Sequence, residues 1–107
     1  MNLPQVIANL VKAQNNQDSV AYANNFSETA IVFDEGKTHK GKIEIQEWIA
    51  DANKKYQTVM KPIEFTPADT TSVLTAEISG SFPGSPAVLN YHFELKDGLI
   101  HSLKTIS

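Results

Sequence analysis

The chain has no cysteine and no arginine among its 107 residues. Without cysteine it forms no disulfide, and thiolate catalysis and cysteine-ligated metal sites are excluded. All nine basic residues are lysines, and they are scattered along the sequence. The bidentate arginine contacts that recognise phosphate and guanine are therefore missing, and we expect no nucleic-acid partner.

Long hydrophobic runs are absent as well. No apolar stretch approaches the ~20 residues that a membrane-spanning helix needs, and the N-terminus lacks a signal-peptide pattern. We therefore expect no membrane partner and a cytoplasmic location. The hydrophobic fraction of 41% is that of an ordinary globular protein, and the length predicts a single domain over residues 1–107.

The first half of the sequence has helical periodicity. Apolar residues recur at helical spacing in three segments, which predicts helices over residues 3–15, from Asp18 to about residue 26, and over residues 42–55. Asn2 is expected to cap the first of these helices. Between the second and third helices, β-branched and aromatic residues predict a strand over residues 30–33 and a short returning strand over residues 38–40.

The second half reads as four extended segments separated by turn residues: 57–66, 71–80, 86–96 and 99–106. In the third of these, Leu89, Tyr91 and Phe93 alternate with polar residues, so they are expected to share the apolar face. Helices followed by an antiparallel meander predict an α+β fold in which the helices pack on one face of a curved sheet.

Asp34 is the residue that most invites a functional interpretation. It ends the apolar run Ala30–Phe33 and is followed by Glu35 and Gly36. Desolvating a carboxylate is costly, so Asp34 is either a solvated turn residue or a carboxyl held in a pocket that raises its pKa. The first interpretation makes it structural, and the second makes it a candidate general base.

The order of these elements carries a family resemblance. The segments "AYANNFSETAIVFDEG", "HKGKIEIQEWI" and "AVLNYHFELKDGLIHSLKTI" resemble the NTF2-like superfamily, and most closely its SnoaL-like and ketosteroid-isomerase-like branches. The resemblance spans essentially the whole chain. It implies a cone, in which helices pack in the concave face of a strongly bent, mostly antiparallel sheet. It also implies a pocket for a small apolar ligand, a homodimer, and chemistry without a cofactor.

The resemblance also suggests roles for three residues. Asp34 falls on the position of the general base of ketosteroid isomerase, an enzyme that uses a tyrosine and a protonated aspartic acid as oxyanion donors. The tyrosine position on the first helix corresponds to Leu10, which cannot donate a hydrogen bond. The aspartic-acid position corresponds to Tyr91, whose phenol is able to donate one.

The pocket is expected to be lined by apolar and aromatic side chains: Leu10, Tyr22, Phe33, Trp48, Leu89 and Phe93. The three histidines show no spacing suited to a metal, so no metal site is expected. Two functions remain open. One is a cofactor-independent isomerase or cyclase in which Asp34 and Tyr91 are catalytic. The other is a non-catalytic ligand-binding or dimeric association domain.

Overall fold

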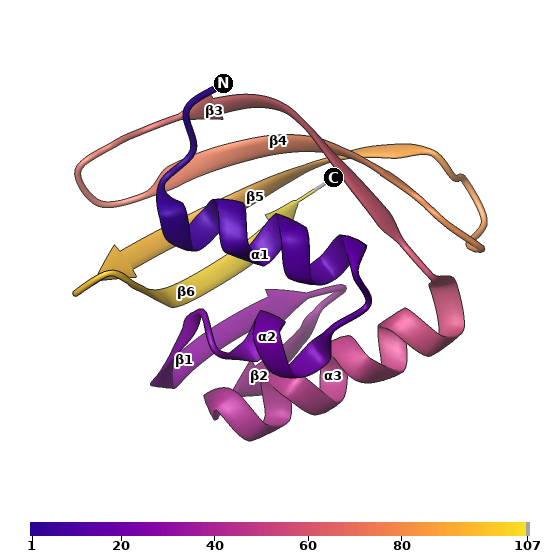
Figure 1. Cartoon of the computed structure of the whole chain (residues 1–107), viewed down its shortest axis with the longest axis horizontal. Coiled ribbons are helices and arrows are strands. Elements are labelled where there is room, and N and C mark those ends of the chain that lie inside the picture. Colours follow the sequence, from indigo (N-terminus) through magenta and orange to yellow (C-terminus); the bar gives the residue numbers. More distant parts are fainter. Residues whose placement is uncertain (107) are drawn as a thin grey trace.

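The computed structural model describes residues 1–106 and consists of three helices and six strands (Figure 1). In chain order these are α1 (Gln5–Asn15), α2 (Ser19–Ala23), β1 (Phe26–Asp34), β2 (Lys37–Lys40), α3 (Gly41–Tyr56), β3 (Val59–Thr66), β4 (Ser72–Ser79), β5 (Ala87–Lys96) and β6 (Leu99–Ile106). The predicted α+β class is confirmed. No helix within residues 1–106 is long and apolar enough to span a membrane.

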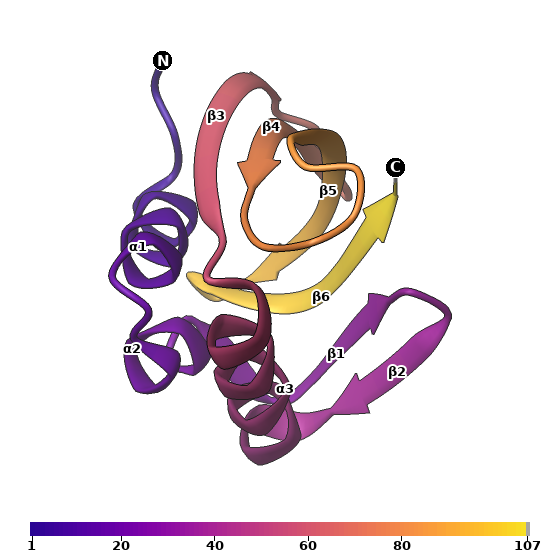
Figure 2. The same cartoon turned by 90° about the vertical axis from the view of Figure 1, so that its right-hand side faces the viewer.

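The six strands form one sheet in the order β2-β1-β6-β5-β4-β3. All neighbours are antiparallel except β1 and β6, which run parallel. The sheet bends strongly and the helices lie on one side of it (Figure 2). This is the bent, mostly antiparallel arrangement that the resemblance implied.

Three boundaries differ from the sequence-based expectation. Helix α2 ends at Ala23 rather than near residue 26. Asn2 does not cap α1, because the helix begins at Gln5 and its N-cap is Pro4. The carbonyl of Pro4 accepts the backbone N–H groups of Ile7 and Ala8, so the helix starts without a side-chain cap. Strand β1 begins at Phe26 rather than at Ala30. Its first pairing is with Ile100 of β6, a long-range partner that local periodicity cannot reveal.

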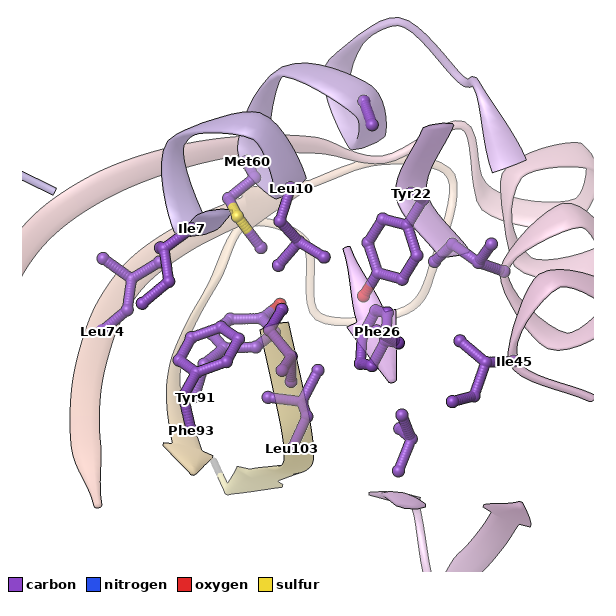
Figure 3. Close-up of a cluster of buried hydrophobic side chains, with 14 of the residues drawn as sticks. Ile7, Leu10, Tyr22, Phe26, Ile45, Met60, Leu74, Tyr91, Phe93 and Leu103 are labelled. Atoms are coloured by element: carbon purple, nitrogen blue, oxygen red, sulfur yellow. The ribbon is translucent and has the colours of Figure 1, made fainter. Parts of the chain in front are cut away.

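The hydrophobic core lies between α1, α2, α3 and the inner face of the sheet. Ile7 and Leu10 point from α1 toward Met60 and the strands below them (Figure 3). Phe26, Phe93 and Leu103 complete the centre of the cluster, and all three are fully buried. Burying an aromatic or aliphatic side chain of this size contributes roughly 1.5–3 kcal/mol, so this cluster holds the helices against the sheet.

Candidate functional site

A cavity of about 820 Å³ opens beside this core, between α3, β2 and the inner face of the sheet. Its volume lies within the range of about 300–1,000 Å³ that is typical of small-ligand sites. Tyr22, Asp34, Trp48, Leu89 and Tyr91 line it. Its mouth is bordered by exposed charged residues: Glu35, Lys37, Glu44, Glu47, Asp51 and Lys55.

Asp34 reaches the cavity because it is the last residue of β1, where the chain turns back into β2. The turn contains Glu35 at φ 51° and Gly36 at φ 75°, and Asp34 pairs with Lys37 across it. Glycine adopts such a positive φ without strain. The alternation of the strand then places Asp34 on the same face as the buried Val32.

Burial raises the pKa of the Asp34 carboxyl above its ordinary value of 3.8. The neighbouring carboxylate of Glu35 raises it further, whereas His39 and the donor side chains of Trp48 and Thr105 lower it. Desolvation is the largest of these effects, since removing water disfavours the charged form. A carboxyl with a raised pKa is a stronger base than an ordinary aspartate.

Tyr91 lies on the inner face of β5 and is only 6% exposed. Its ring stacks on that of Phe93 at a centroid distance of 6.4 Å. Burial, and after it the charge of Asp34, raises the pKa of the Tyr91 phenol well above its usual range. The phenol therefore stays neutral at physiological pH and keeps its proton for donation.

Tyr22 brings a second phenol to the same place from α2. It is 1% exposed, and its ring contacts Phe26 at 5.6 Å and Trp48 at 6.2 Å between centroids. The hydroxyls of Tyr22 and Tyr91 point toward the same central space (Figure 3). Burial raises the pKa of the Tyr22 phenol, and the nearby Tyr91 and Asp34 raise it further. Tyr22, Tyr91 and Asp34 are thus close enough to interact electrostatically.

His39 also borders the cavity. It belongs to β2, and its imidazole stacks on the Trp48 indole at 5.1 Å. Thr105 of β6 is a further wall residue that the sequence did not indicate. Thr105 is the cross-strand partner of Tyr91 in the register of β5 and β6. This pairing depends on the folded sheet, so the sequence alone could not indicate it.

Three of the predicted wall residues lie elsewhere. Leu10 and Phe93 are fully buried in the core and do not border the cavity. Phe33 is 43% exposed, because adjacent residues of a strand point to opposite faces and its neighbour Asp34 points inward. Tyr22, Trp48 and Leu89 do line the cavity, together with Asp34 and Tyr91.

The donor set of the site is suited to proton transfer and hydrogen bonding. Within residues 1–106 no group of three or more histidine, aspartate or glutamate side chains is placed to hold a metal ion. The cavity instead combines one carboxyl of raised pKa, two neutral phenols and apolar walls that include Leu89 and Ile78. Such a set is able to move a proton and to stabilise a developing oxyanion.

Comparison with known proteins places this geometry among related folds. No protein-family model and no curated protein matches the sequence. Among solved structures, a candidate polyketide cyclase from Sinorhizobium meliloti is 36% identical, with a TM-score of 0.92 over 96% of this chain and 94% of that one.

Two more distant structures share the fold. A protein of ketosteroid isomerase-like fold from Catenulispora acidiphila, solved with trimethylamine, is 16% identical, with a TM-score of 0.88 over 99% of this chain and 87% of that one. The epoxide hydrolase/cyclase-like enzyme SalBIII of salinomycin pyran-ring formation is 17% identical, with a TM-score of 0.78 over 95% and 87%. With a close relative at 36% identity and the same architecture throughout, the chain belongs to the NTF2-like superfamily.

Proposed function

We propose that this protein is a cofactor-independent isomerase or cyclase acting on a small, mostly apolar carbonyl compound. The observation that carries the proposal is the meeting of Asp34 and Tyr91 in one cavity, a carboxyl of raised pKa beside a neutral phenol. The candidate polyketide cyclase at 36% identity supports the same class of chemistry.

In the proposed reaction, Asp34 removes a proton from the carbon next to the carbonyl. The C–H electron pair forms the new C=C bond of an enolate, and the carbonyl π electrons move to oxygen, where the O–H of Tyr91 donates a hydrogen bond. In an isomerisation, the carboxylic acid returns its proton to the γ-carbon of the enolate. In a cyclisation, the enolate carbon attacks a second carbonyl of the same molecule, whose oxygen takes up the proton.

The test uses cyclohex-3-enone, a small apolar ketone whose isomerisation to cyclohex-2-enone is followed by ultraviolet absorbance. We expect the protein to accelerate this reaction and Asp34→Asn to lower the rate by about 10²–10⁴, the usual contribution of a general base. Glu35→Gln is the matched control, because it removes the adjacent carboxylate that does not act as the base. It should keep the activity and move the acid limb of the pH profile to lower pH, since Glu35 raises the pKa of Asp34.

Equal rates for Asp34→Asn and the unaltered protein would overturn the proposed mechanism. Incorporation of deuterium from D₂O at the α-carbon gives a second readout that does not require product to form. It covers both the isomerase and the cyclase, because each begins with the same enolate.

A non-catalytic role as a receptor for an amine cation is the second candidate. Five aromatic side chains line the same cavity as the Asp34 carboxyl: Tyr22, Trp48, Tyr56, Phe82 and Tyr91. Aromatic faces and a carboxylate attract alkylammonium ions, and the Catenulispora neighbour was solved with trimethylamine. Trp48 is the one tryptophan of the chain, so its fluorescence reports on the cavity directly. Trimethylammonium should change this fluorescence and Asp34→Asn should abolish the response; an unchanged signal would exclude this candidate.

We also propose a homodimer that forms through the outer face of the sheet. Phe33, Val88 and Ile106 are 43%, 52% and 40% exposed. The strand register brings Ile106 next to Asn90, on the outward-facing side of β5 that also carries Val88. A patch of this kind, mixed with polar residues, has the composition of an ordinary protein interface. Light scattering after size exclusion should give twice the chain mass of 11.8 kDa.

A further inference from the structure

All three tyrosines of the chain line the cavity, but they differ in depth. Tyr22 and Tyr91 are 1% and 6% exposed, whereas Tyr56 lies toward the charged mouth with Lys55 Nζ 5.1 Å above its ring. The two deep phenols come from opposite walls, one from α2 and one from β5, and their hydroxyls point toward the same space (Figure 3).

Tyr22 belongs to the five-residue helix α2, which has hydrogen bonds from side chains at both ends. The Asp18 side chain caps α2 by accepting the Ala21 N–H at 3.0 Å. The Asn25 amide donates to the carbonyls of Ala21 at 3.1 Å and Tyr22 at 3.3 Å, which ties down the other end. With Phe26 and Trp48 against its ring, Tyr22 has its hydroxyl aimed in one direction. Such preorganisation is what an oxyanion donor requires.

The hydroxyl of Tyr22 is the one polar group of this buried side chain. Within residues 1–106 no protein group forms a hydrogen bond with it. It is also not enclosed by protein on all sides, as the unpartnered amide atoms of Asn53 are. It therefore faces the cavity and is available to a ligand. A buried phenol normally finds a partner, and in this position the partner would be an acceptor on the bound molecule.

Resting on the proposed function, we infer that Tyr22 is a second oxyanion donor, which acts with Tyr91 on the carbonyl oxygen of the substrate. The carbonyl oxygen of the substrate would then accept one hydrogen bond from each phenol as the enolate forms. Leu10, at the position where the first helix of ketosteroid isomerase carries a donor, lies in the core and has no access to the cavity. In this chain α2 supplies the donor instead.

The inference is tested by the binding of 4-nitrophenolate, whose charged oxygen on an apolar ring resembles an enolate. Titrations are made in the Asp34→Asn background, because the neutral amide stands in for the protonated base and does not repel the anion. Adding Tyr22→Phe should weaken binding about tenfold, and Tyr91→Phe should do the same, since a hydrogen bond to a charged group is lost in each case. Nitrobenzene, which has no phenolate oxygen, should bind all variants alike.

Tyr56→Phe is the matched control, because it deletes the third phenol hydroxyl of the same cavity. Tyr56 is not among the groups that act on Tyr22, Tyr91 or Asp34, so its loss should change the dissociation constant by less than about twofold. Should Tyr22→Phe fail to fold, ¹³C labelling of the tyrosine ζ-carbons in the Asp34→Asn protein, with all three tyrosines intact, gives the same information. 4-Nitrophenolate must then shift two of the three signals.

An unchanged dissociation constant for Tyr22→Phe, or a shift of one tyrosine signal alone, would overturn the inference. The outcome is separable from that of the proposed function. If Asp34→Asn leaves isomerisation unaffected while Tyr22→Phe weakens 4-nitrophenolate binding, the base assignment fails and the donor pair stands. If Asp34→Asn abolishes isomerisation and Tyr22→Phe has no effect on binding, the reverse holds.

Discussion

Asp34 and Glu35 are adjacent carboxyl groups at the end of β1, but their environments differ. Asp34 is half-buried at the inner face of the sheet, whereas Glu35 is exposed in the turn that follows. Burial raises the pKa of Asp34, and the charge of Glu35 adds to the effect. Asp34 is thus a candidate base, while Glu35 is an exposed carboxylate whose charge raises the pKa of Asp34.

The raised pKa of Asp34 predicts a pH-dependent stability. The pKa of this carboxyl is near 3.8 in the unfolded chain and higher in the folded protein, so the folded state holds the proton to higher pH. The free energy of unfolding should therefore fall as the pH rises from about 3.8 through the raised pKa, and then level off. Asp34→Asn removes the free-energy cost of burying an ionised carboxylate, so this variant should be more stable than the unaltered protein at pH 7. The advantage should vanish below pH 3.8.

Urea denaturation across this pH range measures the effect. Glu35→Gln is the control for a carboxyl lost at the surface, and its effect on stability at pH 7 should be smaller than that of Asp34→Asn. A stability difference between Asp34→Asn and the unaltered protein that did not change with pH would show that the carboxyl is not desolvated.

At the scale of elements, a side chain at the end of α1 forms hydrogen bonds with the backbone of the edge strand β3. β3 is an edge of the sheet, so one side of its backbone has no strand to pair with. The Asn15 side chain accepts the Met60 N–H at 2.7 Å and donates to the Met60 carbonyl at 3.0 Å. Gln17 donates to the Thr58 carbonyl at 2.9 Å. The Asn15 hydrogen bonds therefore connect the end of α1 to β3, and the Gln17 bond connects the residues that flank the two elements.

Asn15→Ala should destabilise the protein by about 1–3 kcal/mol, because it removes two hydrogen bonds and leaves the backbone of Met60 partly buried without partners. The adjacent Asn16→Ala is the control. Its side chain is exposed and makes no hydrogen bond within residues 1–106, so its effect should stay within about 0.5 kcal/mol. Thermal and urea unfolding of the two variants make the comparison. Equal effects would mean that the clamp between α1 and β3 carries no stability.

At the scale of the whole molecule, the two faces of the sheet differ in burial. The inner face carries Tyr91 and Phe93 against the core and the cavity, and the outer face carries Phe33, Val88 and Ile106. Phe33 was predicted as a pocket wall, and its exposure on the outer face makes it part of the proposed dimer surface instead. A single strand therefore places the candidate base on one side of the sheet and a residue of the proposed interface on the other.

Val88→Asp should shift the proposed homodimer to monomer, because it replaces an exposed apolar side chain of the proposed interface with a charged one. Light scattering should then report 11.8 kDa in place of twice that mass. Ile43→Asp is the matched control, since Ile43 is 77% exposed at the start of α3 and lies off the outer face of the sheet. A monomeric unaltered protein, or an unchanged dimer for Val88→Asp, would contradict the proposed interface.

Much of the architecture could be predicted because its signals are local. The spacing of Ile45, Trp48 and Ile49 predicts α3, and the alternation around Tyr91 predicts β5, since each depends on a period of a few residues. The α+β class and the family followed from the order of such elements. Phe26 was assigned to a helix because the polar residues that follow it hide the start of β1, and the pairing that defines this start is with β6.

The sequence by itself determined the fold class, the family and Asp34 as a candidate base, because a carboxyl at the end of an apolar strand is visible in one dimension. Only the tertiary structure decided which groups surround that carboxyl. Tyr22, Tyr91 and Thr105 come from α2, β5 and β6, and they meet Asp34 only because the sheet bends and the helices pack against it. Burial and electrostatic coupling depend on distance in space, so the pKa of Asp34 and the second phenol beside it follow from packing and not from spacing along the chain.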